Sequence, residues 1–414
     1  MQAGARLHRG PGGGAAADSG STPDSSVVLV LALGIPTMTP RIEKFLADQR
    51  PATPCLVMDL EMVRENYLAL ARSLPQARIF YAMKANPAPE IMGMLAEIGS
   101  SFDTASIYEI REALAAGAPP SRISFGNTIK KQTDIAAAYA LGVRLFAFDS
   151  QGELDKLAVA APGAKVYCRI RFEKSKTADW PLGGKFGCSM AMAEELLVSA
   201  GKMGLDPYGV SFHVGSQQRN AGEWDMAVGK AAMLFTNLRE RGVNLRLLNV
   251  GGGLPGHYMT EAASHAEHAS ALTAALNKHF GNRLPEVLIE PGRSLVADAG
   301  MIRSEVVLVS HKIEGGPRWV YLDAGKFGGL IETMDEAIKY RLRTSRDGQG
   351  DSSRAIIAGP TCDEVDVLYQ ETPYALPDDL KPGDTVDFLS AGAYTSTYCS
   401  VAFNGLPPLK TYCV

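Results

Sequence analysis

The chain has 414 residues, of which 46% are hydrophobic and 21% charged, and its formal net charge is −4. This composition is typical of a globular protein with room for two domains, and the mild acidity without a basic block argues against nucleic acid as the main partner. No apolar run is long enough for a membrane span, and six cysteines without C-x-x-C spacing indicate reduced thiols of a cytoplasmic protein rather than a disulfide framework or a metal site.

The first 37 residues are rich in Gly, Ala and Ser, and we expect them to form a disordered extension. An apolar run at 27–33, preceded by Arg6 and Arg9, leaves a secretory signal as the alternative. The small-residue stretch between them is a poor signal segment, so Met38 is the better start. Residues 38–54 contain one short helical pattern and are expected to pack with the C-terminal domain.

From residue 55 to residue 297, short apolar runs alternate with stretches of helical periodicity. Asp59, for example, is a plausible N-cap for a helix whose apolar residues recur every three or four positions. The strand-like runs fall at 79–84, 101–105, 122–126, 143–148, 166–171, 208–214, 246–250 and 287–290. Eight strand–helix repeats over roughly 240 residues predict a parallel (β/α)8 barrel, with an open doubly wound sheet as the alternative.

The sequence pattern changes at residues 298–414, which contain short β-type runs, few helical patterns and turn sequences such as that at 381–384. The runs lie at 306–309, 319–322, 355–358 and 385–389. This pattern predicts a second, mostly antiparallel β domain. The expected fold class is therefore α/β plus β.

Lys84 ends the first strand-like run of the barrel, in the sequence Tyr-Ala-Met-Lys-Ala-Asn. A lysine at a strand end can simply extend its amine to solvent. The alternative is an amine held ready to form a Schiff base, since desolvation can turn lysine into a nucleophile.

Further polar residues fall at other strand ends, and in a (β/α)8 barrel the carboxyl ends of the strands carry the active site. They are Asp103, Arg169, His213, the run Gly251-Gly252-Gly253, and the run Glu290-Pro291-Gly292-Arg293. The glycines and Arg293 suit a phosphate, Glu290 in an apolar strand needs a cationic partner, and His213 could lie against an aromatic ring. Together these positions indicate pyridoxal phosphate.

The order of these and further motifs resembles that of a known family. The motifs Tyr-Ala-Met-Lys-Ala-Asn, Phe-Asp-Thr-Ala-Ser, Phe-His-Val-Gly-Ser, Gly-Gly-Gly, Glu-Pro-Gly-Arg, Gly-Pro-Thr-Cys-Asp and Gly-Ala-Tyr-Thr follow one another as in the fold-type III pyridoxal phosphate decarboxylases of the ornithine and lysine/ornithine group. The resemblance implies an alanine racemase-like barrel, a C-terminal β domain and a homodimer with active sites shared across its interface. It also implies decarboxylation of L-ornithine to putrescine, and of L-lysine to cadaverine.

The resemblance also assigns roles to individual residues. Lys84 becomes the Schiff-base lysine, His213 stacks on the cofactor ring, and Glu290 pairs with the ring nitrogen. The phosphate is held by Ser216, Gly253, Arg293 and Tyr394, and Gly252 and Gly292 also bind the cofactor, while Asp103 and Arg169 line the ring. From the partner subunit, Cys362 protonates the product carbon and Asp363 binds the distal amine. Lys185 and Asp366 resemble an intersubunit ion pair.

The chain departs from the family where a second acidic contact to the distal amine is expected. Glu332, Asp335 and Glu336 compete for that role. Diaminopimelate decarboxylases share two of the motifs but differ after Cys362, and alanine racemase-like enzymes lack the Cys-Asp pair. An inactive regulatory relative is the alternative from another class, and the intact Lys84 and Cys362 argue against it.

Overall fold

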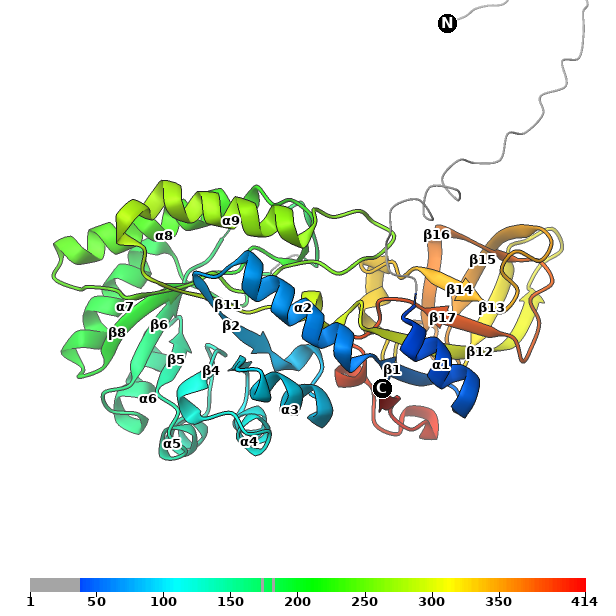
Figure 1. The fold of residues 1–414 in the computed structure, drawn as a ribbon, viewed down its shortest axis with the longest axis horizontal. Coiled ribbons are helices and arrows are strands. Elements are labelled where there is room, and N and C mark those ends of the chain that lie inside the picture. Colours follow the sequence, from blue (N-terminus) through cyan, green and yellow to red (C-terminus); the bar gives the residue numbers. More distant parts are fainter. Residues whose placement is uncertain (1–37, 173–174, 181–182) are drawn as a thin grey trace, which may run out of the picture. The chain divides into compact units, whose positions relative to one another are not determined.

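The computed structural model describes residues 38–172, 175–180 and 183–414 (Figure 1). The expectations for residues 1–37 therefore fall outside the described residues. No helix in the described part of the chain combines the length and the apolar character needed to cross a bilayer.

Eight parallel strands close into a barrel, which confirms the predicted architecture and excludes the open sheet. They are β2 (Ala77–Ala82), β3 (Ser101–Thr104), β4 (Ile123–Phe125), β5 (Leu145–Phe148), β6 (Lys165–Arg169), β8 (Asp206–Ser211), β10 (Leu247–Asn249) and β11 (Glu286–Ile289). The sheet closes because β11 pairs in parallel with β2. The strand β2 begins and ends two residues earlier than the expected run 79–84, so that Lys84 follows it in the 3-10 turn η2 (Met83–Ala85).

Helices surround the barrel. They are α2 (Leu60–Ser73), α3 (Pro89–Glu97), α4 (Ile107–Ala115), α5 (Gln132–Ala140), α6 (Gln151–Ala160), α7 (Met190–Lys202), α8 (Glu223–Glu240), α9 (His265–Phe280) and the short α10 (Arg293–Val296). Side chains alternate along each strand between the barrel interior and these helices. In β2, Phe80 belongs to a small interior cluster with Tyr167 and Leu288, whereas Ile79 and Tyr81 join the large outer core.

The C-terminal domain is a mostly antiparallel eight-stranded sheet, as predicted, with two parallel pairs. Its strands are β12 (Gly300–His311), β13 (Arg318–Leu322), β14 (Leu342–Thr344), β15 (Ser352–Ala358), β16 (Val367–Pro377), β17 (Thr385–Phe388), β18 (Lys410–Cys413) and β1 (Cys55–Met58). The parallel pairs are β1 with β18 and β13 with β15. Short 3-10 turns lie at η3 (Pro120–Arg122), η4 (Gly281–Arg283), η5 (Ile331–Glu336), η6 (Ser396–Tyr398) and η7 (Phe403–Gly405).

The strand β1 corrects the expected domain boundary. It pairs with β12 and β18 and lies among the strands of the C-terminal sheet in Figure 1, so residues 55–58 are not part of the barrel. The preceding helix α1 (Pro40–Gln49) buries Ile42 and Leu46 in one cluster with Met301 and Leu389 of the C-terminal domain. An apolar run of four residues fits either sheet, so sequence periodicity could not assign it.

A buried ion cluster joins the loop after β4 to α6. The Lys130 Nζ donates hydrogen bonds to the carbonyl oxygens of Asn127 and Ala147, and it lies 2.9 Å from Glu153 Oε1. Lys156 binds the other oxygen of Glu153 at 2.5 Å. The Lys130 side chain is fully buried, whereas that of Lys156 is 32% exposed.

This difference in burial gives a matched test. We expect Lys130→Met to lower the free energy of unfolding by about 3–5 kcal/mol, because it leaves the Glu153 carboxylate buried beside one partner. Lys156→Met should cost about 1 kcal/mol or less, since its ammonium is partly hydrated. Denaturant unfolding of both variants measures the difference, and equal losses would contradict the argument from burial.

Candidate active site

A cavity of about 150 Å³ lies at the carboxyl ends of the barrel strands, and both domains line it. Most of the predicted site residues surround it, namely Lys84, His213, Ser216, Gly252, Gly253, Glu290, Gly292, Arg293, Glu332 and Tyr394. Because these residues come from several barrel strand ends and from the C-terminal domain, the barrel closure and the C-terminal domain are both needed to form the cavity.

Lys84 reaches into this cavity with half of its side chain accessible. Its Nζ lies 3.5 Å from Oδ2 of Asp103, at the end of the neighbouring strand β3. Burial lowers the pKa of Lys84, but the attraction of Asp103 and other nearby groups outweighs it, so that the pKa is raised overall. The amine is therefore held as an ammonium beside a carboxylate.

Glu290 follows β11 and faces the same space. Its Oε1 accepts a hydrogen bond from the Asn249 side chain, and the Asn249 Oδ1 accepts another from the Gly251 N–H at 2.8 Å. Burial, followed by repulsion from Asp103, raises the pKa of Glu290 to about 7. The positive charges around Glu290 therefore do not fully stabilise its ionised carboxylate, and a cation bound in the cavity would stabilise it further.

His213 lies on the other wall as a neutral imidazole. Burial and the positive charges of Arg169 and Lys84 lower the pKa of His213 to about 3. Its Nδ1 accepts a hydrogen bond from the Gly215 N–H at 3.0 Å, so the ring proton is on Nε2. A flat, uncharged ring at this place suits stacking on an aromatic ligand.

Arg293 is buried and bonded to Glu332 by two hydrogen bonds of 2.6 and 2.7 Å. The same guanidinium donates to the Tyr258 hydroxyl at 2.8 Å and to Ser216 Oγ at 3.3 Å. Burial lowers the pKa of Arg293, but the Glu332 carboxylate raises it further, so the group is always charged. Both oxygens of Glu332 are engaged here, which differs from the expected contact to a substrate amine.

The glycine run provides space for an anion. Gly253 has a φ of +123°, and a Cβ atom there would lie 2.6 Å from the Gly215 carbonyl oxygen. A side chain is therefore excluded at Gly253, and the backbone of Gly252 and Gly253 lines the cavity. Opposite this run, the Tyr394 ring lies under the Arg293 guanidinium, 4.8 Å from its carbon.

A second cavity of about 190 Å³ adjoins the first and shares two of its lining residues, His213 and Trp180. Arg169, at the end of β6, lines this second cavity and not the first. Trp180 ends the short strand β7 (Ala178–Trp180), which pairs with β9 (Ser216–Gln218) over the barrel mouth. This strand pair could not be predicted from the sequence, because each strand has only three residues and the two are separated by α7 and β8.

Four other predicted residues do not line the cavity around Lys84. Cys362 and Asp363 are exposed, and the Cys362 sulfur accepts a hydrogen bond from the Asn404 side-chain amide at 3.4 Å. Asp335 faces an open depression beside Lys326. Glu336 accepts backbone hydrogen bonds from three successive residues of β16, beginning with Gln370, so its carboxylate fixes η5 to the sheet.

The suggested ion pair of Lys185 and Asp366 does not form within one chain. Asp366 is buried and accepts hydrogen bonds from the Lys326 N–H at 2.7 Å and the Thr361 hydroxyl at 2.7 Å. The Lys185 ammonium instead lies over the Phe186 ring, 5.0 Å from its centre.

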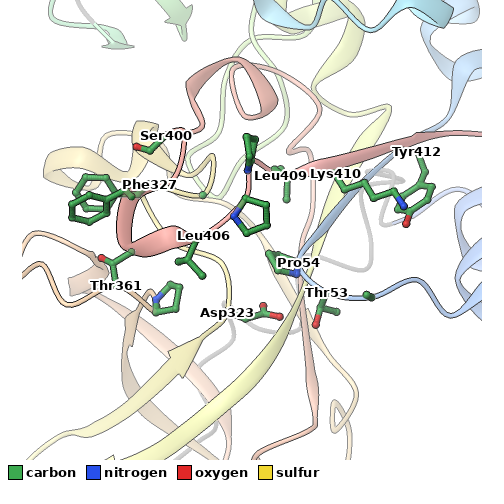
Figure 2. A pocket seen from close by; sticks show the side chains of 16 residues that line it. Thr53, Pro54, Asp323, Phe327, Thr361, Ser400, Leu406, Leu409, Lys410 and Tyr412 are labelled. Atoms are coloured by element: carbon green, nitrogen blue, oxygen red, sulfur yellow. The ribbon is translucent and has the colours of Figure 1, made fainter.

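A cavity of about 520 Å³ in the C-terminal domain is more apolar but contains none of the predicted site residues. Figure 2 shows its lining, with the side chains of Phe327 and Leu406 toward the left of the view and those of Pro54 and Tyr412 toward the right. It lacks a convergent set of charged groups of the kind found at the barrel mouth. Cavity volume is therefore a poor guide to the site, because this cavity is larger than the one of about 150 Å³ around Lys84.

The residues at the barrel mouth fit pyridoxal phosphate. The Nε of Arg293 is buried without a hydrogen-bond partner among the described residues, which leaves a donor for a phosphate oxygen. Glu290 needs a cationic partner, His213 is neutral, and Lys84 supplies an amine. The described residues contain no group of three or more His, Cys, Asp or Glu suited to a metal ion.

Comparison with known proteins agrees with this geometry. Residues 60–297 match the family described as pyridoxal-dependent decarboxylase, pyridoxal binding domain. The lysine/ornithine decarboxylase of Selenomonas ruminantium is 37% identical over 364 residues, which cover 87% of this chain and 89% of that protein. The chain belongs to the pyridoxal-dependent decarboxylases.

Solved structures of other decarboxylases have the same fold. The lysine/ornithine decarboxylase of Vibrio vulnificus complexed with cadaverine has a TM-score of 0.81 and 30% identity, covering 90% of this chain and 97% of that one. The arginine decarboxylase of Paramecium bursaria Chlorella virus bound to agmatine has a TM-score of 0.83 and 27% identity, covering 91% and 100%. This decarboxylase is thus a pyridoxal phosphate-dependent lyase.

Sequence reasoning missed several residues of this decarboxylase that contact the predicted ones. Asn249, Tyr258, Trp180 and Tyr398 are the main examples. Asn249 could have been predicted from its sequence context, because an amide at the end of an apolar strand, shortly before the glycine run, needs a buried hydrogen-bond partner. Tyr258 lies in a loop and Trp180 in a strand of only three residues, so no periodicity marks either of them.

The raised pKa of Glu290 predicts a pH effect on the cofactor-free protein. The folded state holds this proton more tightly than the unfolded state, so the stabilisation is complete below pH 4.5 and is lost as the pH rises through about 7. Glu290→Gln should therefore increase the free energy of unfolding at pH 8 by about 1–3 kcal/mol. The difference from wild type should shrink towards pH 5, and stability curves that stay parallel between pH 5 and 8 would contradict it.

Proposed function

We propose that this decarboxylase converts L-ornithine to putrescine and L-lysine to cadaverine, as a homodimer whose two active sites are shared between the subunits. The proposal rests on the positions of the candidate catalytic residues, which lie in two separate places within one chain. Lys84, Glu290 and Arg293 converge on the barrel cavity, while Cys362 and Asp363 point into solvent elsewhere. A complete site then requires a second copy.

The barrel residues hold the cofactor in this proposal. Lys84 binds it through its amine, Arg293, Ser216 and the glycine run bind its phosphate, and His213 covers its ring. The ionised carboxylate of Glu290 keeps the ring nitrogen protonated, because a negative charge nearby favours the charged form. When bound, pyridoxal phosphate accepts the electron pair left behind by departing CO2.

The exposed loop supplies the remaining groups from the partner. Cys362 donates a proton to the former α-carbon, and the Asp363 carboxylate binds the distal ammonium of the substrate. Asp363 is exposed, and the hydrogen bond that its Oδ1 accepts from the Val365 N–H at 3.0 Å fixes the carboxylate while leaving Oδ2 accessible. A carboxylate suits the ammonium groups of both ornithine and lysine.

Relatives support this substrate class. The Selenomonas ruminantium protein is named for lysine and ornithine, and the Vibrio vulnificus protein has been solved with cadaverine and with putrescine. Diaminopimelate is disfavoured, because its distal carboxylate would meet the adjacent acids Asp363 and Glu364.

Substrate competition tests the proposal. We expect the kcat/KM values for ornithine and lysine to lie within about 200-fold of each other, because one methylene changes binding by only about 1–3 kcal/mol. The value for diaminopimelate should be at least about 30-fold lower than the better of the two, because of like-charge repulsion. Measurement of released CO2 gives these values, with Lys84→Ala as the inactive control. A preference for diaminopimelate would overturn the assignment.

Mixing two inactive variants tests the shared site. Lys84→Ala disables the barrel half of a site and Cys362→Ala disables the loop half. In a mixed dimer both defects fall in one site and leave the other intact, so random subunit exchange should restore about a quarter of wild-type activity.

Exchange is confirmed by co-purification of differently tagged subunits. A mixed dimer that forms and stays at background activity would show that each site lies within one chain. The same experiment with Lys84→Ala and Glu290→Gln serves as control, because both defects lie in the barrel half and no site becomes intact on exchange.

A further inference from the structure

Two thiols lie in contact in the hydrophobic core, next in sequence to residues that line the cavity beside His213, and the proposed reaction uses neither of them. Cys168 is in β6, directly before Arg169, and Cys188 precedes the N-cap residue Ser189 of α7. Their sulfur atoms are 3.5 Å apart, and both side chains are buried, with 0% and 5% exposure.

Main-chain hydrogen bonds hold the two cysteines side by side. The Cys188 N–H donates to the Arg169 carbonyl at 3.0 Å, and the Arg171 N–H donates to the Cys188 carbonyl at 2.8 Å. The Gly187 N–H donates to Asp149 Oδ2 at 2.7 Å. The sulfur contact therefore follows from the backbone arrangement, and a bond of about 2.0 Å requires the sulfurs to approach by only about 1.5 Å.

The two thiols differ in reactivity. The hydrogen bond from Cys168 lowers the pKa of Cys188, although burial opposes it, whereas burial raises the pKa of Cys168. Cys188 also lies just before the first turn of the 13-residue helix α7, where the helix dipole favours a thiolate. Cys188 is thus the nucleophile of the pair, and Cys168 is in place to react next.

We propose that Cys168 and Cys188 are a modification site, at which a small peroxide such as hydrogen peroxide produces a reversible intramolecular disulfide. The Cys188 thiolate attacks one peroxide oxygen, so that an S–O bond forms, the O–O bond breaks and the departing hydroxide takes up a proton to give water. The Cys168 sulfur then attacks the oxidised sulfur, forming the S–S bond and releasing the second water. Two thiols are oxidised by two electrons, and one peroxide is reduced to two waters.

This disulfide would connect two parts of the cavity wall. Arg169 and Arg171 lie one and three residues after Cys168, and Lys185 and Phe186 lie shortly before Cys188. All four line the cavity beside His213. The cross-link would restrain the hydrogen bonds between the two segments. The inference does not depend on which amino acid the enzyme decarboxylates.

Peptide mapping of the holoenzyme tests the proposal. After treatment with hydrogen peroxide and alkylation of the remaining thiols, we expect wild type to lose two of its six thiols and to yield a peptide linked through Cys168 and Cys188. Dithiothreitol should restore both thiols. Cys55→Ala removes a different buried thiol and should leave this result unchanged.

The variants Cys168→Ala and Cys188→Ala should each abolish the linked peptide. In Cys168→Ala the thiol of Cys188 should still react and proceed to the sulfinic acid, because no second thiol is available. Hydrogen exchange at the Arg171 and Cys188 amides should slow by about threefold or more on oxidation of wild type. Absence of the linked peptide, or sulfinic acid at Cys188 in wild type with Cys168 still free, would overturn the proposal. Unchanged exchange in a fully linked sample would overturn the predicted restraint.

Discussion

Charge balance at the barrel mouth is the constraint on which the site depends. Two carboxylates, those of Asp103 and Glu290, face a single ammonium, that of Lys84. Lys84 remains charged beside Asp103, but Glu290 is left with a raised pKa because its neighbours do not compensate it fully. A ligand with a basic ring nitrogen would complete the balance, so the same arrangement that leaves Glu290 unsatisfied favours a cofactor of this kind.

The phosphate side of the site follows a different principle. Arg293 is at the start of α10, whereas Glu332 lies in η5 of the C-terminal domain, so their buried ion pair connects the two domains. Because Glu332 neutralises the guanidinium, a phosphate bound as we propose would obtain much of its stabilisation from the N–H groups of Gly252 and Gly253 and from the Arg293 Nε–H, which has no hydrogen-bond partner among the described residues. In this proposal, hydrogen bonds contribute more than net charge to the binding of a phosphate at this end of the cavity.

The sequence predicted those parts of the protein that repeat or that stand in fixed order along the chain. Eight strand–helix units specified the barrel, and polar residues at strand ends specified the cavity. What it could not predict were partners distant in sequence. The run at 55–58 joined the other sheet, Glu332 paired with Arg293, and Glu336 bound the backbone of β16. A carboxylate in a loop does not reveal its partner, because tertiary packing selects it.

The loop that bears Cys362 and Asp363 is fixed by hydrogen bonds although both of these side chains face solvent. Asp366 anchors it from below, accepting hydrogen bonds from Lys326 and Thr361, and a Cβ atom at Gly359 would lie only 2.4 Å from its carboxylate. Burying the Asp366 carboxylate costs desolvation free energy, and within one chain the turn that it fixes brings no group to the barrel cavity. This cost is explained if the turn must hold the Cys362 thiol and the Asp363 carboxylate at defined positions against another surface. The proposed dimer supplies that surface, since the barrel cavity of the partner has the amine and the phosphate site but lacks both of these groups.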